Sequence, residues 1–309
     1  MASVAFISHP SSKEHNMGNS HPECPERLEA IETQLEKDGL FERLTRVIAK
    51  PATAEQLLRV QQSQYLDWVV EQSPVQGTSM LDPDTSMNPH TLDAAYHAAG
   101  AGVLAVDMIM RSEIERAICC MRPPGHHAES GRAMGFCLFN NIAVAAAHAL
   151  EAWDLERVAV VDFDVHHGNG TEQMFESDAR VLFCSSFQHP FYPGSSPTSQ
   201  VDHIVKSPLA QGSGSAEFRE AVTHQWLPAL IAHQPQMIFV SAGFDAHRRD
   251  QMAGLNLVEE DYQWVTQILV ELACQYSEGR LVSMLEGGYE LHALAQSLSI
   301  HVAELLKSE

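Results

Sequence analysis

The sequence predicts an α/β fold with a mainly parallel central sheet and helices on both faces of that sheet. Short apolar runs rich in β-branched residues recur along the chain, and longer helical patterns separate them, as in repeated βαβ units. Strands of a parallel sheet are buried on both faces, so they appear as continuous apolar runs. No Pro/Ser linker, low-complexity tract or fixed-period repeat divides the chain, and we expect one domain over residues 1–309.

The apolar runs each end in a cluster of Gly, His or Asp, which is typical of buried strands. We expect strands over residues 3–8, 117–121, 157–165, 181–185, 237–242 and 281–285. Helical patterns alternate with them over residues 26–37, 93–110, 141–153, 216–233, 259–276 and 291–306. The first helix follows Pro25, which a first turn tolerates, and precedes Gly39, a typical C-cap residue.

The net charge of the chain limits the classes of molecule that it can bind. Nineteen Lys plus Arg against 40 Asp plus Glu give a formal net charge of −21, which repels phosphate backbones, so we expect no direct nucleic-acid binding. No signal peptide pattern or long apolar stretch is present, which favours a cytoplasmic protein without membrane contact. The six cysteines form no CxxC pair and are predicted to be reduced thiols. The oligomeric state stays open, including a homo-oligomer.

A pattern typical of metal ligands follows the third predicted strand. The period-2 alternation of a strand would place Asp162, Asp164 and His166 on one face. Burying carboxylates side by side is costly unless a cation or strong hydrogen bonds compensate, and an Asp-x-His pair is half of a divalent metal site. A buried hydrogen-bond network is the alternative interpretation.

A third ligand can come from a neighbouring strand end, because ligands of open parallel sheets bind beyond the carboxyl ends of the strands. Asp245 follows the apolar run that begins at Met237. Two Asp and one His leave a coordination position open for water, which is typical of a catalytic site. A metal in such a site lowers the pKa of its bound water from 15.7 to about 7.

Two further strand ends carry groups that suit acid–base and oxyanion chemistry. His126 and His127 follow a Pro-Pro-Gly turn, and Asp162 and Asn169 are suitable partners to fix their tautomers. Tyr289 follows two glycines after an apolar strand, where its phenol can donate to a developing oxyanion, a role worth about 2.7–4 kcal/mol. A hydrogen-bonded loop histidine and a packing tyrosine are the alternatives.

These residues lie in a series of motifs that resembles the zinc-dependent histone deacetylase family, including its bacterial deacetylase-like and acetylpolyamine amidohydrolase members. The motifs are HPECPERL (21–28), RPPGHHA (122–128), GFCLFNN (135–141), VDFDVHHGNGT (161–171), FYPGS (191–195), SAGFDAH (241–247) and LEGGY (285–289). They span nearly the whole chain in the family's order. Asn169 within HHGNGT resembles the class II side of the family. The resemblance implies the arginase/deacetylase-like fold.

The resemblance also implies a mechanism. Asp164, His166 and Asp245 would bind one Zn²⁺. The catalytic residues would be His127 as general base and acid, His126 with Asp162 as electrostatic partner, Asn169 as the support of His127, and Tyr289 as the donor to the scissile carbonyl. The implied reaction is hydrolysis of an acyl-lysine or related acetylated amine to acetate and free amine. Both Zn²⁺ and Fe²⁺ stay open as the ion in the cell.

Further positions follow from the same resemblance. Gly135, Phe136, Tyr192 and Gly287 would line the substrate tunnel. A K⁺ ion would be bound by the carbonyls of Asp162, Asp164, His166 and Ser186 together with the Ser185 hydroxyl. Two positions depart from the family pattern: Phe187 stands where many relatives have His, and Met252 stands near the gatekeeping Glu of polyamine-selective relatives.

Three alternatives to an acyl-lysine deacetylase stay open. One is an acetylpolyamine amidohydrolase, although Met252 weakens a preference for N8-acetylspermidine. Another is a binuclear manganese ureohydrolase of the related arginase-like fold, which needs bridging Asp residues beyond Asp245. The last is a module that binds acylated ligands without turning them over, which the presence of every catalytic position, including Tyr289, disfavours.

Overall fold

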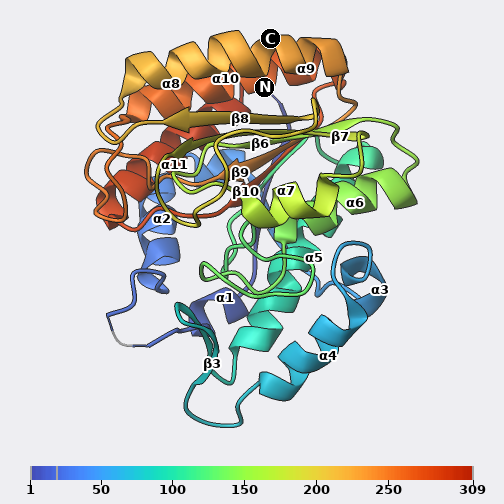
Figure 1. Ribbon diagram of the computed structural model, residues 1–309, viewed down its shortest axis with the longest axis vertical. Helices are drawn as coiled ribbons and strands as arrows, with labels where there is room; N and C mark the ends of the chain where they lie inside the picture. Colours follow the sequence, from blue (N-terminus) through green and yellow to red (C-terminus); the bar gives the residue numbers. More distant parts are fainter. Residues whose placement is uncertain (1, 19, 308–309) are drawn as a thin grey trace.

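A computed structural model describes residues 2–18 and 20–307 of the chain (Figure 1). Its centre is an eight-stranded sheet in the order β2-β1-β5-β10-β9-β6-β7-β8. Every neighbouring pair in this sheet is parallel, so all eight strands end at the same edge. The strands are β1 Val4–Ser8, β2 Thr45–Ile48, β5 Arg116–Cys119, β6 Val158–Asp162, β7 Val181–Gln188, β8 Ile204–Leu209, β9 Ile238–Ala242 and β10 Leu281–Leu285. The predicted α/β class is confirmed.

Helices cover both faces of this sheet (Figure 1). On one face lie α2, α8, α9, α10 and α11, and on the other α5, α6 and α7. The helices are α1 Ser11–Glu14, α2 Glu26–Lys37, α3 Ala54–Leu57, α4 Ser63–Gln72, α5 Thr91–Met110, α6 Asn141–Ala152, α7 Asn169–Phe175, α8 Ser215–Ala221, α9 Leu227–His233, α10 Glu259–Tyr276 and α11 Leu291–Leu305. A 3₁₀ turn spans Phe41–Arg43, and a hairpin of β3 Ser79–Asp82 and β4 Thr85–Met87 stands apart from the sheet.

Alternation along the strands divides the core into two layers. Phe6 and Ile118 pack toward α2 and α11, whereas Ile7 and Cys119 pack toward α5 and α6. Both sides of each central strand are therefore buried, which explains why these strands appear as continuous apolar runs in the sequence. Within the part of the chain that the structure describes, no helix has the length and apolarity that crossing a bilayer requires.

One predicted strand boundary is wrong at a position that matters for the site. The predicted strand 157–165 ends at Asp162, so Asp164 and His166 lie in a loop and not on one strand face. The cause is local hydrogen bonding. Asp162 Oδ1 accepts the backbone N–H of Asp164 at 3.1 Å, and Asp164 Oδ1 accepts that of His166 at 2.9 Å. Side-chain acceptors of this kind compete with the strand ladder and turn the chain.

Other differences concern edges and short elements. The sheet gains β2 and β8, which were not predicted because these edge strands mix charged residues or proline with apolar ones. The short helices α1, α3, α4 and α7 were also not predicted. The predicted helix 216–233 is interrupted by a π-helical turn at Val222–Trp226 between α8 and α9.

Candidate active site

The candidate site lies beyond the carboxyl ends of four adjacent strands, β5, β10, β9 and β6. The loop after β6 carries Asp164 and His166, the loop after β9 carries Asp245, and the segments after β5 and β10 carry His127 and Tyr289. Residues up to 162 positions apart in the chain are thereby brought to one edge of the sheet. This is the edge at which open parallel sheets bind their ligands.

Asp164, His166 and Asp245 form a compact, buried group. His166 Nδ1 lies 3.1 Å from Asp164 Oδ1 and 3.2 Å from Asp245 Oδ2. The three residues are 1%, 7% and 1% exposed, respectively. Burial opposes a charge on the ring, yet the adjacent Asp164 and Asp245 carboxylates raise the pKa of His166 to about 10. The two carboxylates therefore favour positive charge where the three side chains meet.

This group fits a divalent transition metal. Ligand atoms about 2.0–2.1 Å from a tetrahedral ion stand roughly 3.3 Å apart, close to the separations seen here. Three of the four carboxylate oxygens accept backbone N–H groups. Asp245 Oδ1 accepts that of Val165, and Asp164 accepts that of His166 at Oδ1 and that of Gly287 at Oδ2. Among the described residues, Asp245 Oδ2 is buried without a hydrogen-bond partner. A lone pair left in this way is available to an ion.

Glycines make room for the carboxylates. A Cβ at Gly287 would stand 2.2 Å from Asp245 Oδ2, and one at Gly243 would stand 2.0 Å from Asp164 Oδ2. Gly287, predicted as tunnel lining, thus lies against the carboxylates, and it is not among the residues that line the cavity described below.

The two neighbouring histidines have different partners and opposite proton affinities. Burial disfavours charge on His126, but Asp162, whose Oδ2 lies 2.9 Å from His126 Nδ1, and other carboxylates raise its pKa well above the ordinary value. Burial together with His126 and His166 lowers the pKa of His127 well below it. His127 Nδ1 lies 2.8 Å from Asn169 Oδ1. Asn169 Nδ2 is donating to Glu129 Oε1, so its oxygen faces His127, which leaves Nε2 of His127 as the free acceptor.

A cavity of about 280 Å³ opens above this group. It is lined by Asp84, His127, Gly135, Phe136, His166, Phe191, Tyr192, Met252 and Tyr289. The rings of Tyr192 and His127 meet edge-on at 5.2 Å, and those of Phe136 and Tyr289 at 5.9 Å. Burial raises the pKa of Tyr289 well above its ordinary value, so the phenol keeps its proton. The cavity joins an aromatic wall to a proton acceptor and a proton donor.

Ser185 and Ser186 lie on β7, where Ser185 pairs with Asp162 of β6, and both serines are buried. The Ser185 hydroxyl lies 2.9 Å from Nδ1 of His167. The other ring nitrogen, Nε2, lies 2.6 Å from Glu172 Oε2. The predicted cation ligand Ser185 therefore also supports the residue next to His166.

Two buried acidic residues near the site were not singled out from the sequence. Glu286 accepts the backbone N–H groups of Gly125 at 2.7 Å and His126 at 3.2 Å, and burial raises its pKa to about 7 against the opposing effect of His126. Glu23 is ion-paired with Arg122 and with Arg27, and Arg27 donates to the Glu286 and Gly288 carbonyls. The sequence signal that could have identified Glu286 is its position directly after an apolar strand.

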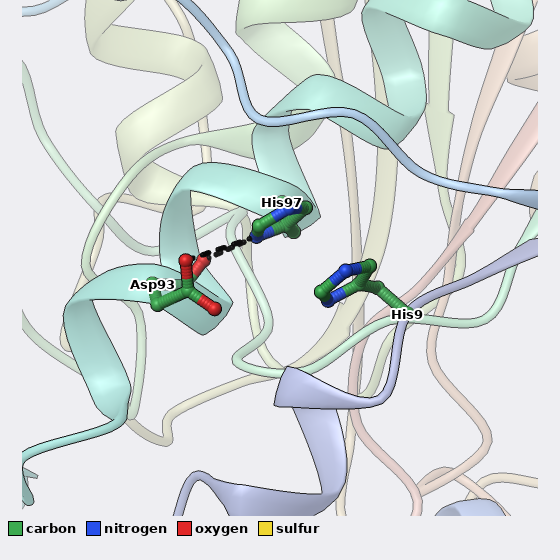
Figure 2. A group of neighbouring side chains, drawn as sticks. All are labelled: His9, Asp93 and His97. Carbon is green, nitrogen blue, oxygen red and sulfur yellow. Dashed lines mark hydrogen bonds and ion pairs between the residues drawn. The ribbon is translucent and has the colours of Figure 1, made fainter.

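A second group of potential ligands lies at the surface (Figure 2). His9 follows β1, whereas Asp93 and His97 lie one turn apart at the start of α5. The rings of His9 and His97 stack at 3.6 Å with an interplanar angle of 6°. Ring-nitrogen lone pairs lie in the ring planes, so two parallel rings do not direct them at a common ion. This group was not predicted, since His9 stands 84 positions before Asp93 and 88 before His97.

Comparison with known structures defines the class of protein. The solved HDA15 HD domain superposes with a TM-score of 0.93 at 34% identity, over 99% of this chain and 88% of that one. An all-parallel sheet with this cluster at its carboxyl edge is the arginase/deacetylase fold. The histone deacetylase domain profile matches residues 21–305, and the chain belongs to the histone deacetylase family. The predicted resemblance is confirmed, and the chain is a hydrolase of the deacetylase class.

Curated relatives agree with this assignment. An uncharacterized Synechocystis protein is 39% identical over 98% of both chains. Polyamine deacetylase HDAC10 of Homo sapiens is 36% identical over 92% of this chain, which spans 45% of that longer protein.

Proposed function

We propose that this chain hydrolyses the amide of an acyl-lysine or related acetylated amine and releases acetate and the free amine. The observation that carries the proposal is the convergence of Asp164, His166 and Asp245 below a cavity whose wall includes His127 and Tyr289. Acceptor, donor and ligand group therefore surround one space, as amide hydrolysis requires. Phe136, Tyr192 and Gly135 would flank the aliphatic arm of the substrate.

One Zn²⁺ would be held by Asp164, His166 and Asp245, whose chemistry and spacing suit it. When bound, it supplies Lewis-acid activation of water and of the scissile carbonyl. We further propose that K⁺ is bound by the carbonyls of Asp162, Asp164, His166 and Ser186 and by the Ser185 hydroxyl.

The remaining groups would handle protons and charge. His127 would accept a proton at Nε2, because its pKa is lowered and its Nδ1 is committed to Asn169. The same nitrogen would return the proton to the departing amine. Tyr289 would donate its hydroxyl hydrogen bond to the carbonyl oxygen as negative charge develops there. The His126–Asp162 pair would stabilise charge beside this reaction.

An acetylpolyamine is the second candidate substrate. One curated relative is named a polyamine deacetylase, Asp84 lines the cavity, and the net charge of −21 would attract a polycation. Met252, an uncharged residue, lines the same cavity, which favours the acyl-lysine side chain. A binuclear ureohydrolase is disfavoured, because Ala246 follows Asp245 and the ligand group of the described residues at this site has three members.

A substrate panel with metal analysis tests the proposal. Purified protein at one Zn²⁺ per chain is assayed for acetate release from acetyl-lysine and acetylpolyamines, for trifluoroacetate release from trifluoroacetyl-lysine, and for urea release from guanidino substrates. We expect amide turnover that falls about 10²- to 10³-fold in Tyr289→Phe. Full zinc occupancy without turnover of any acylated amine would contradict the proposal, and two Mn²⁺ per chain with urea release would favour the ureohydrolase.

A further inference from the structure

The loop that carries Tyr289 has an anchor outside its own strand and helix. Asp250 is 7% exposed, and its Oδ2 accepts the backbone N–H of Tyr289 at 2.6 Å and that of Glu290 at 3.0 Å. Its Oδ1 accepts the N–H of Met252 at 3.0 Å. One carboxylate thus joins two segments that lie 39 positions apart in the chain.

The Tyr289 loop needs such an anchor because its own chain constrains it weakly. Gly287 and Gly288 precede it, and Gly288 has a φ of +117°, a conformation that glycine adopts readily. A second cavity, of about 340 Å³, lies beside the loop and is lined by Pro22, Asp250, Gln251, Met252, Tyr289 and Glu290. Hydrogen bonds hold this backbone from two sides, because Asp250 accepts from Tyr289 and Glu290 and Arg27 donates to the Gly288 carbonyl.

The same carboxylate also reaches the wall of the substrate cavity. Met252, whose N–H it accepts, lines the candidate tunnel together with Tyr289. Arg249 adds a second tie between the two segments, because its Nη2 donates to Glu290 Oε1 at 2.9 Å. The positions of Met252 and Tyr289 in the cavity wall are therefore linked through Asp250.

We propose that Asp250 is a positioning residue for Tyr289. Its carboxylate fixes the backbone at 289 and thereby the place of the phenol in the cavity wall. The inference rests on the proposed function, in which the Tyr289 hydroxyl donates to the substrate carbonyl. Asp250 itself lines the neighbouring cavity and takes no part in proton transfer.

A double-mutant cycle on turnover tests this coupling. Asp250→Asn keeps one acceptor oxygen for three N–H donors and turns an NH₂ group toward the others, so the loop shifts. We expect kcat to fall on the order of 10²-fold, as for a displacement near 1 Å, with KM changed less than about threefold. In the Tyr289→Phe background, Asp250→Asn should cause little further loss, because the phenol it positions is already absent. Multiplying losses would overturn the inference.

Asp261→Asn is the matched control. Asp261 is fully buried and accepts from Val258 N–H, Ser215 Oγ and Arg219 Nε at the start of α10, and it is not among the residues that line either cavity. Its loss should lower Tm while kcat of the folded protein stays within about twofold of the parent. A kcat loss in this control as large as that of Asp250→Asn would mean that the effect is general destabilisation.

A spectroscopic readout separates this inference from the proposed function. The chain has six tyrosines, so 3-fluorotyrosine labelling gives a simple ¹⁹F spectrum in which Tyr289→Phe identifies the resonance of residue 289. That resonance should move or split in Asp250→Asn and stay in place in Asp261→Asn. A parent without turnover would contradict the proposed function while this spectrum still tests Asp250. An unchanged resonance would overturn the inference.

Discussion

Among the described residues, two groups of three His and Asp side chains bring potential metal-ligand atoms within 4.8 Å of one another, and they differ in almost every other respect. Asp164, His166 and Asp245 are buried at the ends of β6 and β9. In the group of His9, Asp93 and His97, Asp93 is exposed, His9 is partly exposed and only His97 is buried. Both groups therefore have short distances between their potential ligand atoms, and the two groups differ in how many of their residues are buried.

The partners of the ligand atoms show what burial changes. In the surface group, His9 Nδ1 accepts the N–H of Ser11 at 3.2 Å, and His97 Nδ1 lies 2.9 Å from the Asp93 carbonyl oxygen. These nitrogens already have partners, and water can solvate Asp93. In the buried group, Asp245 Oδ2 has no hydrogen-bond partner among the described residues and little access to water. A buried lone pair of this kind is costly unless a cation binds it.

Removal of a buried ligand should have the largest effect. Asp245→Ala takes away one of three ligands, and we expect loss of the bound ion together with a fall in kcat/KM of at least about 10³-fold, the size of a several-kcal/mol effect. Asp93→Ala is the matched change in the surface group and should leave both quantities unchanged. Elemental analysis after dialysis, with a parallel activity assay, measures both. Loss of the tightly bound ion from Asp93→Ala would reverse the ranking of the two groups.

A methyl group placed beside the buried carboxylates should have the next largest effect. In Gly287→Ala the new Cβ would meet Asp245 Oδ2 at 2.2 Å and Asp164 Oδ2 at 2.6 Å, so at least one ligand must move. We expect metal affinity to fall roughly 10- to 100-fold, as for changes in groups that orient metal ligands. Competition with a zinc chelator measures this affinity.

Gly214→Ala is the control for that substitution. Its Cβ would meet Asn256 O at 3.4 Å, an ordinary contact, and Gly214 lies before α8 and away from the ligand group. Zinc affinity should be the same as in the parent. An equal loss of affinity in both variants would show that the glycines act on stability and not on ligand placement.

The partner of His127 gives a smaller effect that depends on pH. Asn169 is a neutral partner, and burial together with His126 and His166 lowers the pKa of His127. Asn169→Asp places a carboxylate at Nδ1, which favours the protonated ring and raises this pKa. Because the base must be unprotonated, the rising limb of kcat/KM should move to higher pH, with about tenfold lower activity on that limb for each unit moved. A limb that moves to lower pH would contradict the assignment of His127 as base.

The sequence predicts the buried site well because its residues follow strand ends. Asp162 and Asp245 come directly after apolar runs, and a parallel sheet brings such ends together whatever the loop details. The expectation that Asp164 and His166 continue a strand is wrong, because side-chain acceptors turn the chain after Asp162. The predicted residues are nevertheless brought together, since the turn directs them to the same edge of the sheet.

Other features depend on tertiary contacts that leave no local pattern. Asp250 and Glu286 accept backbone N–H groups, and any residue type except proline can supply such a donor, so their partners have no sequence signature. Edge strands β2 and β8 lack the continuous apolar pattern because one side of each has no neighbouring strand. The stacking of His9 on His97 depends on how the end of β1 meets α5, which only the packed structure defines.

The surface group supplies the smallest expected effect. His97→Ala removes the stacked partner of His9, and an aromatic contact of this kind stabilises a protein by about 0.5–1.5 kcal/mol. Burial and, secondarily, His97 lower the pKa of His9 from its ordinary 6.5. The contribution of His9 to the free energy of unfolding is therefore fully present above pH 6.5 and is lost as the pH falls below this value. In His97→Ala the loss should be smaller, because one cause of the lowered pKa is removed.

Thermal unfolding of the parent and His97→Ala between pH 8 and pH 5 tests the surface group, for which the smallest effect is expected. Bound zinc is measured on the same samples. We expect a small drop in Tm, a flatter dependence of Tm on pH and an unchanged zinc content. Titration with added Zn²⁺ should give the same Tm increase in both proteins, because the ion binds at the buried group that both retain. A smaller increase in the variant would show that the parallel rings separate to bind an ion, and burial would then no longer distinguish the two groups.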